Sequence, residues 1–575
     1  MNFKILGFLL PLGLVGLVAC AQIPTKIETE TIAESADSAE AANLPKQELT
    51  APVLFDFLLG ETALQRGYPE IAIKSYLRLA ETTRDYRIAQ RATEIALRIH
   101  HPFAAERAVA IWAALDPDSE DANQTAAALL INMGKLDEAR PYLKKLLAAE
   151  GVVIGNAFLQ LSKLLSHNDN KVETLKLVQQ LAQPYPDLPE AHFVVSQAAW
   201  FAGQFELALN EMKRALALRP DWEMAAIYQG RILRRTSYAD AAEFYQNFVN
   251  KYPKANDTRL AFIRLLMAER NLDQAREQRQ FLLTNNPADV DVVLTVALLS
   301  MDLRDFDVAE ESFKKALSLG YKDTSLIHFH LAQIYEETQR VDMAMESYRL
   351  VTSGGQFLPS QIRYAALLAQ KGNLEDARQY LQQLPAANDQ QMAHLILAEA
   401  QLLRESGATH QEVFDLLDSG LENLPDYPEL LYDRALAADK IGKFELVEQD
   451  LRKLIQLRPD SAHAYNALGY SLAERGVRLP EALRLIKKAV ALSPEDAYIM
   501  DSLGWVYYRM GNIKDGLNYL NLAFAARPDP EIAAHLGEVL WVQGAKENAI
   551  EIWQSALEGH PDNEVLLETM KRLMR

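Results

Sequence analysis

Cysteine is almost absent from this chain: Cys20 is the only one in 575 residues. A single cysteine excludes an internal disulfide and a zinc site built from cysteines. Basic residues are also few, because 59 Lys and Arg stand against 78 Asp and Glu and leave a formal net charge of −19. Sequence-independent binding to nucleic acid needs Lys and Arg to replace the counterions of phosphate, so no nucleic-acid partner is expected.

The short motifs that carry catalysis or bind cofactors are missing as well. The sequence has no GxxxxGK[ST], no GxGxxG after a strand, no HExxH and no GxSxG. The eleven histidines are scattered, and His328 and His330, two residues apart, lie on different faces of a helix. We therefore expect no enzyme activity, no cofactor and no metal site.

The N-terminus carries one short apolar run. Lys4 precedes an uncharged stretch, residues 5–18, which is short for a membrane span and has the length of the apolar region of a signal peptide. The sequence Leu-Val-Ala-Cys at residues 17–20 resembles the lipobox of bacterial lipoproteins. In those proteins the peptide is cleaved before the cysteine, whose thiol takes a diacylglyceryl group. An ordinary secretory signal with a chance cysteine is the alternative.

The lipobox resemblance implies a signal peptide over residues 1–19 and lipidation at Cys20, with acyl chains such as palmitate that hold the protein on a membrane. By the sorting rule of enterobacterial lipoproteins, Ala rather than Asp at position 21 favours the outer membrane, with the body facing the periplasm. Residues 20–50 are rich in Ala, Ser, Thr and Glu and contain no aromatic residue. Such a composition buries too little apolar surface to fold alone, and we interpret it as a flexible acidic tether.

The remainder of the chain repeats with a period of about 34 residues. Prolines close successive segments, and neighbouring ones are 33 to 35 residues apart within each run. They are Pro220, Pro253 and Pro287 in the first run, and Pro425, Pro459, Pro494, Pro528 and Pro561 in the second. The pattern is strongest from 189 to 349 and from 428 to 563. A fixed period of this length is typical of a solenoid, in which each repeat packs on its neighbours.

Within one period the pattern predicts a helix, a turn and a second helix. The clearest copy, residues 498–528, places Leu503, Gly504 and Tyr507 on the first helix, Gly511 at the turn, and Leu520 and Ala523 on the second. This order resembles the tetratricopeptide repeat (TPR) family. The resemblance implies an all-α fold: a right-handed superhelical solenoid of about fifteen helix-turn-helix pairs over residues 51–563.

The last residues, 564–575, predict an amphipathic capping helix. Its apolar residues, which could cover the last repeat, are Val565, Leu566, Met570, Leu573 and Met574. Its basic residues would remain in water and suit the C-terminal end of a helix.

The TPR resemblance also predicts a groove for proteins or peptides, because the first helix of each pair lines the concave surface. Three Leu-Gly pairs, at 468–469, 503–504 and 536–537, align the relevant positions. The predicted partner-binding groove consists of His463, Asn466, Tyr470, Tyr498, Asp501, Trp505, Tyr508, Glu538 and Trp541. Aromatic residues bury a large area with little loss of rotamer freedom, which makes them effective binding residues. Tyr508 and Trp541 could equally be packing residues.

Three C-terminal segments are more specific than a generic TPR. AHAYNALGYSLAERG, DAYIMDSLGWVYYRMGN and PDPEIAAHLGEVLWVQG are similar to a family of proteobacterial outer-membrane TPR lipoproteins. That family includes the lipoprotein partner of a carboxyl-terminal processing protease. The resemblance implies a non-enzymatic scaffold that brings a periplasmic protease together with cell-wall hydrolase substrates. A structural assembly factor for outer-membrane or cell-envelope machinery is the alternative, and an enzyme hidden in the weak repeats is a third possibility.

The lipobox leads to a direct prediction. Cys20→Ala should leave a folded protein that no longer fractionates with membranes, because residues 21–50 offer no other apolar anchor. Membrane fractionation followed by immunoblotting measures this. Retention of the variant in the membrane pellet after a high-salt wash would show that Cys20 is not the anchor.

Overall fold

The computed structural model describes residues 48–148, 153–166 and 168–574. Within these residues it contains 31 helices, α2 to α32, and no strand. The expected all-α fold is confirmed. The thirty helices from α2 to α31 correspond to the expected fifteen pairs, and α32 follows them. The predicted signal peptide, Cys20 and nearly all of the predicted tether lie outside the described residues.

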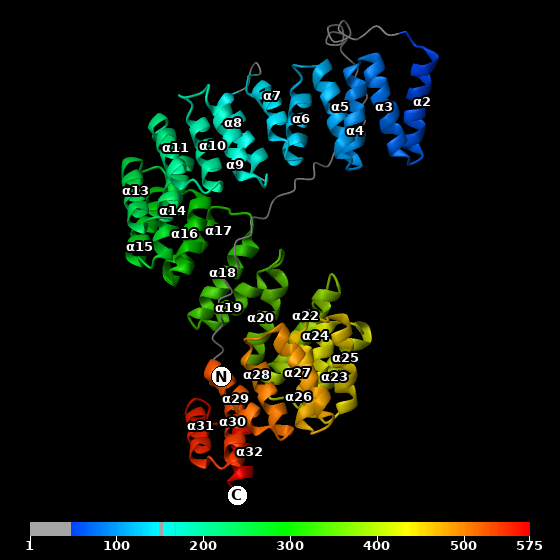
Figure 1. The fold of residues 1–575 in the computed structure, drawn as a ribbon. Helices are drawn as coiled ribbons and strands as arrows, with labels where there is room; N and C mark the ends of the chain where they lie inside the picture. The colour runs from blue at the N-terminus through cyan, green and yellow to red at the C-terminus, as the bar shows by residue number, and fades with distance from the viewer. Residues whose placement is uncertain (1–47, 149–152, 167, 575) are drawn as a thin grey trace. The chain divides into compact units, whose positions relative to one another are not determined.

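The chain divides into two compact units, one ending at Glu269 and the other beginning at Arg270. Within each unit, consecutive helices lie side by side in chain order (Figure 1). The first unit contains α2 (Ala51–Gln65), α3 (Pro69–Thr83), α4 (Tyr86–Arg98), α5 (Pro102–Leu115), α6 (Glu120–Asn132), α7 (Leu136–Ala148), α8 (Ile154–Leu165), α9 (Lys171–Ala182), α10 (Pro189–Phe201), α11 (Phe205–Leu218), α12 (Glu223–Arg234), α13 (Tyr238–Lys251) and α14 (Asn256–Ala268).

The second unit contains the remaining helices. They are α15 (Leu272–Asn285), α16 (Val290–Asp302), α17 (Phe306–Ser318), α18 (Thr324–Glu337), α19 (Val341–Arg349), α20 (Phe357–Gln370), α21 (Leu374–Gln383), α22 (Asp389–Glu405), α23 (His410–Asn423), α24 (Pro428–Lys440), α25 (Phe444–Leu457), α26 (Ala462–Glu474), α27 (Leu479–Leu492), α28 (Ala497–Arg509), α29 (Ile513–Ala526), α30 (Pro530–Gln543), α31 (Lys546–Gly559) and α32 (Glu564–Leu573).

Small residues let the two helices of a pair approach closely. Gly504 on α28 faces α29, where a Cβ atom would lie 2.7 Å from Leu520 Cγ and 2.9 Å from the Gly516 carbonyl oxygen. Only glycine fits such a crossing. The turn that follows α28 is also made by a glycine, since Gly511 has a φ of 82°, which other residues rarely adopt. Gly504 is therefore required by the close approach of the two helices, and Gly511 by the positive φ of the turn.

The last helix, α32, packs on the end of the array. Leu566 is fully buried and belongs to one cluster with Ala534, Ala549 and Trp553. Met570 and Leu573 pack against the same cluster. Two of the expected covering residues do not take part, because Val565 and Met574 remain exposed. The buried side of α32 covers the last helix pair, as the terminal element of a repeat array must.

In the part of the chain that the structure describes, no helix has the length and apolar character needed to span a membrane.

The crossing of α28 and α29 gives a stability prediction. Gly504→Ala should destabilise the second unit by about 1–3 kcal/mol, because the added methyl group meets backbone atoms that cannot move aside. Gly559→Ala is the matched control, since a Cβ at Gly559 in α31 meets no atom within 4 Å. Thermal unfolding followed by circular dichroism compares the two. Equal midpoints for both variants would contradict the close crossing.

Candidate functional site

The predicted groove residues all lie on three helices of the second unit, α26, α28 and α30. These helices are the first members of three consecutive pairs, and α28 contacts both α26 and α30. Side chains at equivalent positions of neighbouring repeats therefore come together although about 34 residues separate them in the sequence. A cleft of about 700 Å³ lies between these helices and α32.

The cleft contains three of the predicted residues and several that the pattern did not indicate. Trp505, Tyr508 and Glu538 are the predicted ones. The others that line it are Glu474, Arg509, Gly511, Val565, Glu568, Thr569 and Arg572. The walls thus combine aromatic rings with both carboxylates and guanidinium groups.

A buried histidine–aspartate pair lies beside the cleft. His535 Nδ1 is 2.9 Å from one Asp501 carboxylate oxygen and 3.0 Å from the other. Its second nitrogen, Nε2, lies 3.2 Å from the Tyr470 hydroxyl. The imidazole stacks on the Trp505 ring, with centroids 4.3 Å apart and planes 22° apart. Three predicted groove residues are therefore organised by a histidine that the repeat pattern did not select.

The protonation of His535 reflects two opposing influences. Burial disfavours the charged imidazolium most strongly, but the carboxylates of Asp501, Glu474 and Glu538 together outweigh it, so the pKa of His535 is raised above its ordinary value of 6.5. Burial raises the pKa of Tyr470, and the nearby carboxylates of Glu474 and Asp501 add to the effect. The polar groups under the cleft thus form one coupled set.

Trp505 forms a wall of the cleft. Its side chain is only 4% exposed. The indole Nε1 donates a hydrogen bond to Glu474 Oε2 at 2.7 Å, which fixes the ring edge toward α26. Arg509 donates to the Glu474 backbone oxygen at 2.7 Å and lies over the Trp505 ring. Trp505 is therefore a rigid, mostly covered surface, whereas Glu474 is the more accessible group, with its side chain 52% exposed.

The opposite wall is held by the terminal helix. Arg572 on α32 donates two hydrogen bonds to the carboxylate of Glu538, which is itself buried. The Tyr508 hydroxyl donates to Glu538 as well, at 3.4 Å. Burial, together with Glu538, raises the pKa of Tyr508. The capping helix therefore contributes directly to the site.

Four further predicted groove residues do not line the cleft. His463 is exposed, and Asn466 has a buried Oδ1 without a hydrogen-bond partner in the described structure. Tyr498 donates to Asp529 at 3.0 Å. Trp541 packs on Trp553, with ring centroids 5.7 Å apart. Trp541 thus has the packing contact that was the alternative to its groove role.

The repeat pattern did not indicate four residues whose side chains contact the predicted ones in and beside the cleft: Glu474, Arg509, His535 and Arg572. Glu474 and Arg509 end α26 and α28, just beyond the positions that the family pattern assigns to the groove. His535 occupies a position adjacent to an assigned one, and Arg572 comes from the terminal helix, which has no place in the repeat pattern. Only the basic composition of residues 564–575 could have indicated the last of these.

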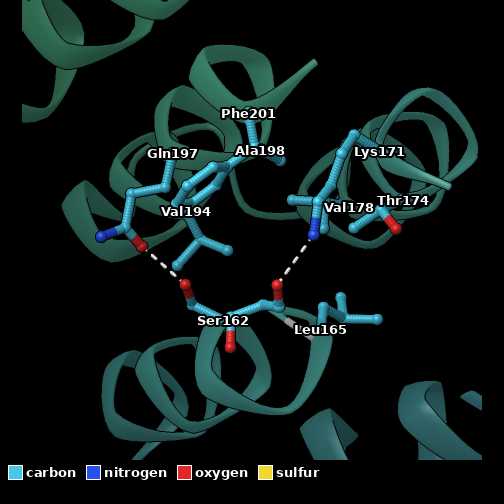
Figure 2. A pocket seen from close by; sticks show the side chains of 10 residues that line it. Ser162, Leu165, Lys171, Thr174, Val178, Val194, Gln197, Ala198 and Phe201 are labelled. Atoms are coloured by element: carbon cyan, nitrogen blue, oxygen red, sulfur yellow. Dashed lines mark hydrogen bonds between the residues drawn. The ribbon is translucent and has the colours of Figure 1, made fainter. Parts of the chain in front are cut away.

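The first unit offers other hollows. One, of about 20 Å³ between α8, α9 and α10, is bridged by a hydrogen bond from Ser162 to Gln197 at 2.6 Å (Figure 2). Lys171, which also lines this hollow, donates a hydrogen bond to the Ser166 backbone oxygen at 2.9 Å. This volume suits about one water molecule. A second groove, of about 730 Å³, lies among α6, α7 and α8 and has an apolar floor that includes Leu143, Leu147 and Leu161.

Noncovalent binding is the chemistry that the C-terminal cleft supports. Arg509 pairs with Glu474 and Arg572 with Glu538, and the aromatic rings present apolar surface beside these ion pairs. In the described residues, no three His, Cys, Asp or Glu side chains gather as a metal ion would require. The arrangement suits a polypeptide segment with mixed polar and apolar side chains.

The matches to known protein families fall on the same helical repeats. A family model described as tetratricopeptide repeat matches residues 196–256, 294–357, 432–497 and 502–564. The TPR repeat-containing protein PA4667 of Pseudomonas aeruginosa is 32% identical over 521 residues, which cover 90% of this chain and 88% of that protein. Cellulose synthase operon protein C of Pseudomonas fluorescens is 24% identical over 268 residues, covering 43% of this chain and 20% of that protein.

Solved structures overlap with parts of the chain. A thermophilic TPR protein of Thermus thermophilus, TTC0263, covers 33% of this chain and 100% of its own, at 24% identity and a TM-score of 0.29. A tetratricopeptide repeat protein of Parabacteroides merdae covers 50% of this chain and 99% of its own, at 19% identity and a TM-score of 0.33. With such low scores, the family assignment rests on the sequence matches.

The His535–Asp501 pair gives a pH prediction. A histidine whose pKa is raised on folding stabilises the fold below its unfolded pKa, and this contribution is lost as pH rises through the folded pKa. His535→Gln should therefore lower the unfolding midpoint more at pH 5.5 than at pH 8.5. Melting curves of both proteins across this range measure the difference, and His463→Gln, on the exposed end of α26, is the control. A pH-independent difference would contradict the raised pKa.

Proposed function

The chain belongs to the tetratricopeptide-repeat protein family, and we propose that it is a lipid-anchored scaffold that brings partner proteins together at the bacterial outer membrane. TPR arrays are generally protein-binding modules without catalytic activity of their own. The observation that carries the proposal here is the cleft between α26, α28, α30 and α32, where aromatic and charged side chains meet. The repeats thus supply a preformed binding surface, which lowers the entropy cost of binding.

The membrane anchor in this proposal is Cys20. Its support is the lipobox-like ending of the apolar run at residues 17–20, followed by an acidic stretch without aromatic residues. Acylation at Cys20 would leave the repeats in the periplasm, at the end of a tether on the order of 30 Å long. The solenoid would then act close to the membrane without inserting into it.

The partner in this proposal is a carboxyl-terminal processing protease, together with its cell-wall hydrolase substrates. The support is the similarity of the three C-terminal segments to outer-membrane TPR lipoproteins, and in particular to LbcA, the lipoprotein partner of such a protease. Two proteins held on one scaffold meet at a raised effective concentration without new chemistry. Standard interfaces occupy roughly 800 Å² per partner, so separate repeats can serve the protease and the substrate.

The distribution of charged residues between the two units also supports a binding role for the cleft. Residues 270–575 contain 31 Lys and Arg against 46 Asp and Glu, whereas residues 48–269 contain 25 against 27. The excess of carboxylates therefore belongs to the unit that contains the cleft. We infer that the segment bound there carries positive charge, which would speed its association and make it sensitive to salt.

The cleft is tested by substituting its accessible carboxylate. Glu474→Gln keeps an oxygen that can accept from Trp505 Nε1 but removes the charge, so binding of one partner should weaken roughly tenfold. Substitution of Trp505 itself is unsuitable, because its burial means that truncation would leave a cavity. Affinity for the purified protease and for each substrate measures the effect, with protease activity on the substrate as the functional readout.

Glu551→Gln, at an exposed position of α31, is the charge-matched control and should leave all affinities unchanged. The adaptor proposal predicts that the scaffold alone has no hydrolase activity and accelerates the protease on its substrate. If no periplasmic protease co-purifies with the tagged protein from crosslinked membranes, the adaptor role is wrong. If Glu474→Gln and Glu551→Gln had equal effects on affinity, the cleft would not be part of the binding surface.

A further inference from the structure

The terminal helix α32 contacts the preceding helix pair differently from the first helices of the repeats. Each first helix from α18 to α30 contacts the preceding pair mainly at that pair's second helix. Helix α32 contacts the preceding pair mainly at its first helix, α30, and much less at α31. It therefore lies toward the surface that the first helices form, which is where the C-terminal cleft is found.

Few buried residues hold α32 in this position. It is 10 residues long, and only Leu566 and Thr569 are buried, with Met570 and Leu573 half-buried beside them. Helix α30 has 14 residues and buries eight of them. A terminal element with so few buried contacts detaches at a lower free energy than the unfolding of the whole unit requires. Helix α32 is therefore the part of the cleft that can open while the rest stays folded.

The polar contact that holds α32 is made in the cleft itself. Arg572 donates two hydrogen bonds to the carboxylate of Glu538, which is 6% exposed. A carboxylate that is buried to this extent depends on a paired cation, because removing the cation alone would leave an uncompensated charge. The Arg572 side chain, in contrast, is 58% exposed. Another cation can therefore approach this pair from the solvent, whereas the anion stays fixed under the cleft.

A positively charged segment in the cleft would compete with Arg572. An arginine or lysine side chain of such a segment could pair with Glu538 only after Arg572 has moved away. The Tyr508 hydroxyl, which also donates to Glu538, would keep one hydrogen bond to the carboxylate during this exchange. Because Arg572 lies at the end of α32, the exchange would release the helix from its polar contact in the cleft.

We propose that α32 is an intramolecular ligand of the C-terminal cleft and that a basic segment of the partner displaces it on binding. This inference rests on the function proposed above, since it requires a partner at the cleft. In the closed state Arg572 pairs with Glu538. In the open state a basic side chain of the partner pairs with Glu538, and the surface of α30 that α32 covered becomes accessible. Because only open molecules bind, the apparent affinity is the intrinsic affinity multiplied by the open fraction.

Amide hydrogen exchange tests the displacement. The full chain is measured alone and with a saturating amount of either the purified protease or a purified cell-wall hydrolase substrate. The partner that binds the cleft should slow exchange in α26 and α28 and accelerate it at least about threefold in α32, because a helix this short is marginal in water once it detaches.

The direction of the change in α32 decides between two roles. Slower or unchanged exchange in α32, together with protection of α26 and α28, would identify α32 as a fixed wall of the cleft and overturn the displacement. The absence of protection in α26 and α28 with both proteins would instead contradict binding at the cleft, and with it the proposed function.

Affinities of substituted chains give a second test. Leu566→Ala removes the fully buried anchor of α32 without changing its charge, so the same partner should bind roughly fivefold more tightly. Leu451→Ala, on α25 away from the cleft, removes a similarly buried side chain and should leave the affinity unchanged. Arg572→Gln should also strengthen binding, and it replaces Leu566→Ala if circular dichroism shows that variant to be unfolded. Weaker or unchanged binding by the folded variant would contradict an intramolecular ligand.

Discussion

No single helix of this chain can bury its own apolar side, and the structure depends on helices that approach one another closely enough to do so together. The approach is set by small residues at the crossings, of which Gly504 against α29 is the tightest example described above. Where the residue at a crossing is a glycine, the facing helix contributes a large side chain. The indole of Trp553, for example, occupies the space beside Gly537. The core is therefore a series of local contacts between neighbouring helices.

This local packing explains where the cleft lies. Helices α26, α28 and α30 repeat the same orientation, so residues separated by about one period become neighbours. Trp505 meets Glu474, and His535 meets Asp501, across 31 and 34 residues of sequence. The terminal helix then replaces the next repeat and supplies Arg572 where that repeat would have stood. A binding surface follows from the repeat geometry without any loop of its own.

The fold was more predictable than the site for a physical reason. A period of 34 residues, with glycine at crossings and turns, is imposed by packing, and it predicted the helix pairs even where the repeat pattern was weak. The repeat pattern does not determine which side chains are exposed to solvent. Asp501 and Trp505 occupy groove positions of the repeat, yet both are buried, because Asp501 pairs with His535 and Trp505 with Glu474. The pattern assigns positions one helix at a time, whereas these partners come from neighbouring helices.

Whether the C-terminal cleft holds another protein can be measured by site-specific photo-crosslinking in living cells. The photoreactive residue is placed at position 508 in the cleft and, in a second strain, at position 555 on α31. We expect a discrete adduct with a periplasmic protein from position 508 and none from position 555. Absence of any adduct from position 508, with the protein folded and present at its normal level, would contradict it.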